Sequence, residues 1–272
     1  VLRNDPLVVG KLAVDELGNQ LDRAEAEHDL VAGDDDVERL VGVAELAGEF
    51  GDGLARQDHF GARVLAGDGA LGVGQAMERA AAGTFIPVST ELGGKDPGYV
   101  RADADLEKAV DTLMDGAMYN AGQCCCGIER IYVHESLYDV FVEKAVAWVN
   151  AQKLGNPLDS ETTLGPMANV RFAREVRAQI EEALADGAVA HIEKMPADDG
   201  GAYLTPQILT SVTHDMRVMR DESFGPVVGI MPVKNDEEAI ALMNDCRFGL
   251  TASIWTSDSA AAEAIGDRIE TG

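Results

Sequence analysis

Basic residues and long apolar runs are both scarce in this sequence. The 272-residue chain carries 22 lysines and arginines against 48 aspartates and glutamates, which gives a formal net charge of −26. Nucleic acids and anionic membrane surfaces repel such a charge, so we exclude both as partners. No apolar run approaches the roughly 20 residues that cross a bilayer. No basic segment followed by an apolar one opens the chain, which argues against a secretory signal, and without an initiator Met we expect the beginning to be missing.

Cysteine is also rare, and its placement is unusual. The chain has four cysteines, of which Cys124, Cys125 and Cys126 are consecutive and Cys246 stands apart. Consecutive cysteines do not provide the spaced pairs of a disulfide framework. No Cys-x-x-Cys or nearby pair of histidines accompanies them, so we predict no metal site. Free thiols fit a reducing, cytoplasmic location, and we expect a thiol to be used for chemistry.

From about Asp96 onward, short β-prone runs alternate with amphipathic helical patterns. Strands connected through helices form a largely parallel sheet, so the sequence predicts an α/β domain. Asp103 or Asp105 is expected to open the first helix, and Ser136 to cap the second. The predicted strands cover residues 98–100, 130–133, 188–192, 226–233 and 250–255. The predicted helices lie between and after them and are expected to end near residues 117, 148, 185, 245 and 269.

Residues 1–68 lack this alternation. They are rich in Gly, Asp, Glu, Ala and Val, and their apolar residues recur at no sustained period. A helix is expected there only over residues 37–50. The composition changes near residues 67–74, where we place the organisational boundary of the chain.

The strongest signal for chemistry is Tyr-Asn-Ala-Gly-Gln-Cys-Cys-Cys at residues 119–126. A reactive cysteine needs a thiolate at an accessible loop near positive dipoles. A cysteine can equally serve as a small buried hydrophobe, and the three cysteines alone leave both interpretations open. The segment resembles the active-site motif of aldehyde dehydrogenases, in which the nucleophile stands two places after the Gln of Gly-Gln. The resemblance selects Cys125.

A second segment, Thr-Glu-Leu-Gly-Gly-Lys at residues 90–95, resembles the motif that carries the general base of the same family. The base would be Glu91. Taken alone, a surface Glu before a Gly-Gly turn is common. The two motifs are 34 residues apart (125 minus 91), close to the separation expected in the family. Two matched motifs at a matched distance favour the resemblance over coincidence.

A third segment, Glu-Ser-Phe-Gly-Pro-Val at residues 222–227, resembles the cofactor segment of the family. The resemblance implies that Glu222 holds the nicotinamide ribose hydroxyls and that Phe224 packs near the nicotinamide. A carboxylate can accept a hydrogen bond from each of two neighbouring hydroxyls. A turn that ends in Gly-Pro is the simpler alternative. Segments at residues 164–167, 203–206 and 248–253 resemble mainly structural parts of the family, so the resemblance runs from about residue 74 to residue 272.

The resemblance implies an oxidoreductase that converts a small-molecule aldehyde to a carboxylic acid with NAD or NADP. In this scheme Cys125 attacks the carbonyl carbon to form a thiohemiacetal, and its backbone N–H helps to hold the oxyanion. Loss of hydride leaves a thioester, and Glu91 activates the water that hydrolyses it. The family also implies a homo-oligomer.

Upstream of Gly74 the sequence departs from the family. It has neither the Pro-Trp-Asn segment of the oxyanion hole nor the Lys-Pro-Ser/Ala-Glu segment that binds the adenosine ribose. Gly69 and Gly74 keep the spacing of the phosphate-side loop and are candidate cofactor contacts, but Ala70 stands where Ser is expected. We therefore expect residues 1–92 to be an atypical or incomplete remnant of the Rossmann-like cofactor-binding region. Residues 93–272 are expected to form the catalytic domain, truncated before a strand used in oligomer contacts.

Three functions stay open at this point. The first is the NAD(P)-dependent oxidation of an aldehyde. The second is an inactive fragment or pseudoenzyme that does not bind the cofactor. The third is a thiol esterase that uses Cys125 and Glu91 without nicotinamide, because thioester hydrolysis needs only a nucleophile, a base and oxyanion donors. Saturable cofactor binding separates the first function from the other two.

Overall fold

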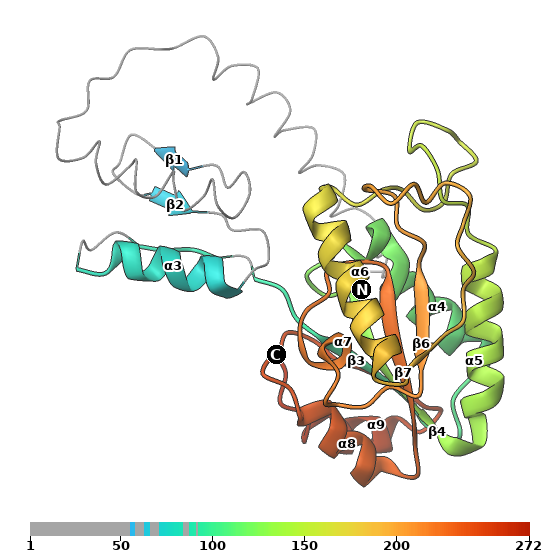
Figure 1. The fold of residues 1–272 in the computed structure, drawn as a ribbon. Helices are drawn as coiled ribbons and strands as arrows, with labels where there is room; N and C mark the ends of the chain where they lie inside the picture. The colour runs from blue at the N-terminus through green and yellow to red at the C-terminus, as the bar shows by residue number, and fades with distance from the viewer. Residues whose placement is uncertain (1–54, 58–62, 66–70, 84–86, 91) are drawn as a thin grey trace, which may run out of the picture. The chain divides into compact units, whose positions relative to one another are not determined.

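The computed structural model describes residues 55–57, 63–65, 71–83, 87–90 and 92–272 (Figure 1). These residues belong to the compact unit Gly53–Gly272, which is distinct from the unit Val1–Asp52. The helix expected over residues 37–50 lies outside the described residues. Before the main sheet in sequence, β1 (Ala55–Gln57) pairs antiparallel with β2 (Arg63–Leu65), and α3 covers Leu71–Ala81. Within the described ranges, no helix combines the length and apolarity that a membrane span requires.

The alternation that begins near residue 96 forms a six-stranded sheet. Its strand order is β5-β6-β7-β4-β3-β8, and neighbouring strands run parallel except for β5 and β6. The α/β fold with a largely parallel sheet is therefore confirmed. The sequence prediction misses β6, because a buried run of four residues carries no period that separates it from a loop. The strands are β3 (Asp96–Val100), β4 (Ile128–His134), β5 (Val189–Ala190), β6 (Gln207–Thr210), β7 (Val227–Val233) and β8 (Ser253–Trp255).

Helices connect the parallel strands, and their first residues partly follow the prediction. Asp105 caps α4, because its carboxylate accepts the Lys108 backbone N–H. The predicted cap at Ser136 is wrong: α5 begins one residue earlier, and the His134 ring accepts the Ser136 N–H as β4 ends. The helices after β3 are α4 (Leu106–Met118), α5 (Glu135–Asn150), α6 (Val170–Ala185), α7 (Arg217–Arg220), α8 (Asp236–Asn244) and α9 (Ser259–Gly266).

Alternate residues of the central strand β4 pack on opposite faces of the sheet. Ile131 and Val133 join the larger core, to which α4 and α5 contribute. Tyr132 belongs to the smaller core with α8 and α9, as does its neighbour Tyr99 on β3. Both faces are thus covered, as a mainly parallel sheet requires. Arg130 of β4 is buried on the same face as Tyr132 and donates to the carbonyls of Leu242 and Met243 in α8.

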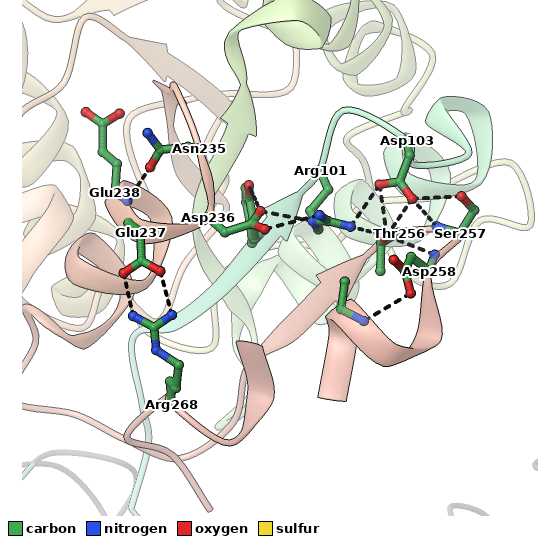
Figure 2. A network of polar contacts seen from close by, with 12 residues as sticks. Arg101, Asp103, Asn235, Asp236, Glu237, Glu238, Thr256, Ser257, Asp258 and Arg268 are labelled. Carbon is green, nitrogen blue, oxygen red and sulfur yellow. Dashed lines mark hydrogen bonds and ion pairs between the residues drawn. The ribbon is translucent and has the colours of Figure 1, made fainter. Parts of the chain in front are cut away.

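A polar network lies at the edge where the parallel strands end (Figure 2). Arg101, directly after β3, donates to both carboxylate oxygens of Asp236, the first residue of α8, at 2.9 and 3.1 Å. Asp103 accepts hydrogen bonds from the hydroxyls of Ser257 and Thr256, which follow β8. These bonds lower the pKa of Asp103 to about 2. Open α/β sheets commonly bind ligands at the carboxyl edge. Here the polar side chains of that edge bond to one another and connect the ends of β3 and β8 with the start of α8.

Candidate active site

Four of the matched sequence segments lead directly into a parallel strand. Lys95 precedes β3, Gly127 precedes β4, Pro226 precedes β7 and Ala252 precedes β8. Because these four strands run parallel, their amino ends meet at one edge of the sheet. Segments as far as 155 residues apart in sequence are therefore hydrogen-bonded neighbours there. The candidate site lies at the amino edge, opposite the network of Figure 2.

The cysteine segment is a constrained loop between α4 and β4. It begins with the short 3-10 helix η1 (Tyr119–Gly122), in which Asn120 and Ala121 have positive φ values of 51° and 55°. The Gln123 side chain anchors the start of the cysteine run: its amide nitrogen donates to the Asn120 carbonyl at 3.0 Å, and its oxygen accepts the Ala168 N–H at 2.7 Å. A turn from the Cys124 carbonyl to the Gly127 N–H then leads into the strand. The loop presents its thiols from a defined backbone.

The three consecutive thiols differ in their surroundings. All are free, and Cys125 and Cys126 are exposed while Cys124 is half-buried. The sulfurs of Cys124 and Cys126 lie 3.6 Å apart. This contact, together with partial burial, raises the pKa of Cys126 to about 11, so Cys126 stays protonated near neutral pH. The Cys125 backbone N–H donates to no acceptor within the part of the chain that the structure describes.

Two glycines bring the cysteine loop against the segment at residues 222–226. Gly122 has a φ of 72°, and a Cβ at this position would lie 2.1 Å from the Gly225 carbonyl oxygen. Only glycine allows the two backbones to approach so closely. The contact places the cysteine loop beside the Glu222 segment, although about 100 residues separate them in sequence.

A buried carboxylate holds the Glu222 segment in place. The two oxygens of Glu129 accept the backbone N–H groups of Ser223 and Phe224, each at 2.8 Å. Phe224 adopts a φ of 49°, a left-handed conformation that costs a bulky residue on the order of 1–3 kcal/mol. The two hydrogen bonds stabilise that conformation. Glu129 thus fixes the backbone on which the predicted cofactor residues stand.

Lys95 completes this buried network. Its side chain is fully buried and donates to Glu129 at 2.6 Å and to the Ser223 hydroxyl at 3.0 Å. The Ser223 hydroxyl in turn donates to Gln179 of α6 at 2.7 Å. Burial lowers the pKa of Lys95, while the charge of Glu129 opposes the shift. The ion pair therefore links the segments before β3 and β7 through a residue of β4.

Glu222 carries the one buried side-chain polar atom, among the described residues, that has no hydrogen-bond partner. This atom is its Oε1. Burial first, and then the negative charge of Glu129, raise the pKa of Glu222 from 4.5 to about 7, whereas Lys95 and the Gly94 backbone N–H lower it. The Glu222 carboxylate lies against Gly93, where a Cβ would come within 1.5 Å of Oε1. A buried acceptor without a donor is uncommon in a folded protein, so the Glu222 side chain stands out among the described residues of this edge.

Alanine is expected to act differently at the two glycines of this junction. At Gly122 the clash is with a backbone oxygen at a positive φ, so Gly122→Ala should destabilise the protein by about 1–3 kcal/mol or more. At Gly93 the clash is with the end of the flexible Glu222 side chain, which can rotate away, so the folded state should be largely retained. Urea unfolding measures both. A larger loss for Gly93→Ala than for Gly122→Ala would contradict this packing.

The site residues named from the sequence fall into three groups. Cys125, Glu222 and Phe224 lie in loops at the amino edge of the sheet. Gly74 lies within α3, and a Cβ there would be 3.1 Å from Leu92. The predicted base Glu91 and the predicted phosphate contact Gly69 lie outside the described residues.

The sequence motifs give no role to several residues of this edge. Lys95 belongs to a motif without a role of its own, and no role is predicted for Glu129, Ser223 or Gln179. A signal is present, because Glu129 interrupts the apolar strand Ile-Glu-Arg-Ile-Tyr-Val and charged residues are rarely buried unless paired. The sequence does not show which residues pair with Glu129, since Lys95 and Ser223 lie 34 and 94 residues away from it.

Comparison with known proteins extends this picture. The model of the aldehyde dehydrogenase family matches residues 40–272. The chain is 38% identical over 209 residues to a 2-hydroxymuconic semialdehyde dehydrogenase of Pseudomonas putida, covering 75% of this chain and 43% of the relative. It is 35% identical over 221 residues to the NADP(+) succinate-semialdehyde dehydrogenase 1 of Mycobacterium ulcerans, covering 81% and 48%.

Solved structures give the same match. The NAD+ complex of an aldehyde dehydrogenase from Bacillus cereus superposes with a TM-score of 0.73 at 32% identity, covering 77% of this chain and 42% of that one. An aldehyde dehydrogenase from Brucella melitensis gives a TM-score of 0.71 at 37% identity, covering 77% and 43%. The chain spans less than half the length of each of these four proteins.

Proposed function

The chain belongs to the aldehyde dehydrogenase family, and we propose that it oxidises an aldehyde to a carboxylic acid with NAD or NADP. The observation that carries the proposal is the junction at the amino edge of the sheet. There Cys125 is exposed on a fixed loop, and that loop contacts the segment of Glu222, whose Oε1 has no hydrogen-bond partner among the described residues. In this proposal residues 93–272 are the catalytic domain, and the free thiols fit a reducing cytoplasm.

The nucleophile in this proposal is Cys125. Its thiolate adds to the carbonyl carbon of the aldehyde and gives a thiohemiacetal, whose oxyanion the Cys125 backbone N–H stabilises. Loss of hydride converts this species to a thioester. Glu91 then removes a proton from water, the water attacks the thioester carbon, and the carboxylic acid leaves as the thiol is restored.

The residues at this edge fit a nicotinamide cofactor. The Glu222 carboxylate, whose Oε1 has no partner among the residues that the structure describes, supports a contact with a ribose hydroxyl, since a carboxylate can accept from two neighbouring hydroxyls. Phe224, fixed through its N–H by Glu129, supplies an apolar surface next to it. When bound, NAD or NADP would accept the hydride that the thiohemiacetal releases. The Bacillus cereus relative was solved with NAD+, and the Mycobacterium ulcerans relative carries NADP(+) in its name.

Cofactor binding is expected to depend on pH through Glu222. A carboxyl whose pKa is about 7 is mostly protonated below that pH and then accepts ribose hydrogen bonds less well. The affinity for NAD or NADP should therefore rise with pH and level off above about 7, with a slope of up to about tenfold per unit below it. Glu222→Gln should flatten this profile. Fluorescence titration of the full chain at several pH values measures it.

The same shift has a consequence for stability. The folded protein holds the Glu222 proton more tightly than the unfolded chain, whose carboxyl titrates near 4.5. The group therefore favours the folded state at low pH and loses this advantage as the pH rises from about 4.5 to about 7. Glu222→Gln should remove that loss. A cofactor affinity that stays constant from about pH 5 to about pH 8 would contradict the proposed contact between Glu222 and the cofactor.

Cofactor-independent ester hydrolysis is the second candidate function. It is favoured by one observation: Cys125 is exposed on a loop that is fixed by residues 120, 127, 168 and 225 alone, all of them within the described part of the chain. Fluorescence titration with the cofactor separates the two functions. Saturable binding of NAD or NADP supports oxidation, whereas ester cleavage without any cofactor binding supports the hydrolase.

A further inference from the structure

The sulfurs of Cys124, Cys125 and Cys126 converge, although consecutive residues in an extended chain point in opposite directions. All three lie within 4.8 Å of one another, and Cys124 and Cys126 are 3.6 Å apart. The turn closed by the Cys124 carbonyl and the Gly127 N–H, at 3.0 Å, curls the backbone and produces this arrangement. Three soft donors thus share one small region of the surface.

The loop that carries the three sulfurs is held from both sides. Gln123 bonds to Asn120 and to Ala168 before the cysteines, and Gly127 bonds back to Cys124 after them. Gly122 packs on the Gly225 backbone. A donor set on such a backbone loses little conformational entropy when it binds an ion. The sulfurs are therefore pre-organised.

The spacing suits one class of ion. In a tetrahedral zinc–thiolate site the Zn–S bonds are about 2.3 Å, which places the sulfurs about 3.8 Å apart. Cys124 and Cys126 already lie at 3.6 Å, and a side-chain rotation brings Cys125 from within 4.8 Å. Thiolates select zinc and related soft ions over magnesium or calcium. The cysteine spacing alone predicts no metal site, but the turn brings the three sulfurs together. We propose that Cys124, Cys125 and Cys126 form a three-sulfur site for a divalent ion of the zinc class.

The chemistry of binding balances without a further reagent. Each thiol that ligates the ion releases its proton to solvent, so one Zn²⁺ and three thiols give a three-thiolate complex and three protons. Three protein ligands leave the fourth position to water. The strongly acidic chain also attracts divalent cations to its surface.

Occupation of this site would inhibit the proposed reaction, a consequence that rests on the proposed function. The lone pair with which Cys125 attacks a carbonyl carbon is shared with the ion, and the bound ion blocks approach to the loop. Inhibition should be reversed by a chelator, because no covalent bond to carbon is formed. Metal binding itself does not depend on turnover and can be measured without substrate.

The test is a titration of the reduced, full chain with Cd²⁺, which gives an ultraviolet thiolate-to-metal absorption, followed by competition with Zn²⁺. We expect saturation at one ion per chain. Cys124→Ser and Cys126→Ser should each weaken binding by at least about 100-fold. Loss of a residue that only hydrogen-bonds to a metal ligand already weakens binding by up to about 100-fold, and loss of a ligand itself should cost no less. Cys246→Ser, outside the cluster, is the control and should bind as the wild type does.

A second readout uses the unmodified protein. Zn²⁺ should protect Cys125 from alkylation by iodoacetamide, as seen by peptide mass spectrometry, and a chelator should restore the labelling. Binding that persists in both serine variants, or Cys125 labelling that zinc leaves unchanged, would overturn the site. Protein that binds the ion through all three cysteines but shows no dehydrogenase or esterase activity would support the site and contradict the proposed function instead.

Discussion

Replacing Cys125 with alanine is expected to reduce both aldehyde oxidation and ester hydrolysis by about 10⁴-fold or more, the scale on which loss of a nucleophile acts. Cys124→Ala should keep most of the activity. Cys125 is exposed, whereas Cys124 is half-buried and contacts Cys126, whose pKa of about 11 keeps it protonated. The measurement is the steady-state rate of NAD(P)H formation and, without cofactor, the release of an ester's chromophoric alcohol.

Cys126→Ala is the matched control for this experiment. It removes a second exposed thiol of the same loop while leaving Cys125 in place. If the Cys124 or Cys126 variant loses activity and the Cys125 variant keeps it, the nucleophile has been assigned to the wrong sulfur. Loss in all three variants together with an altered unfolding midpoint would point to the loop structure instead.

Removing the buried carboxylate of Glu129 is expected to have the largest effect on stability. Glu129→Ala leaves Lys95 fully buried without its ion-pair partner, and it frees the N–H groups of Ser223 and Phe224. Breaking a buried ion pair from one side typically costs about 3–5 kcal/mol. The free energy of unfolding, measured in urea, should fall by about that amount.

Two comparisons make this result specific. Glu237→Ala removes an exposed ion pair with Arg268 and should leave the urea midpoint unchanged. Replacing both buried partners, as Lys95→Met with Glu129→Gln, should recover part of the stability, because no unpaired buried charge remains. A double variant that is less stable than Glu129→Ala alone would contradict the view that Lys95 left without its partner is the main penalty.

Much of the fold follows from periodicity in the sequence. The alternation of β-prone runs and helical patterns predicts the parallel strands β3, β4 and β7, whose runs are continuous and buried. Short elements such as β6 and α7 are not predicted, because four residues are too few to show a strand or helix period. The cap at Ser136 fails for a local reason: the helix already begins at Glu135, and the ring of His134 accepts the Ser136 N–H.

The site was predictable to a similar extent. Cys125, Glu222 and Phe224 come from motifs, and the structure adds why they can meet: each motif precedes a parallel strand, so all reach the same edge. The role of Glu129 could not be foreseen, because its hydrogen bonds to the Phe224 segment span 94 and 95 residues. A single sequence carries no record of such pairs.

The most direct test is to find which sulfur carries the acyl group. In the Glu91→Gln protein, hydrolysis of the thioester should slow, so that an activated ester leaves a stable acyl-enzyme for peptide mass spectrometry. Because adjacent thiols can exchange such a group, the mapping is repeated with Cys124 and Cys126 both changed to serine. The account predicts one acyl group on Cys125 in both proteins. Acylation of Cys124 or Cys126 that vanishes in the serine protein, with Cys125 unmodified, would contradict it.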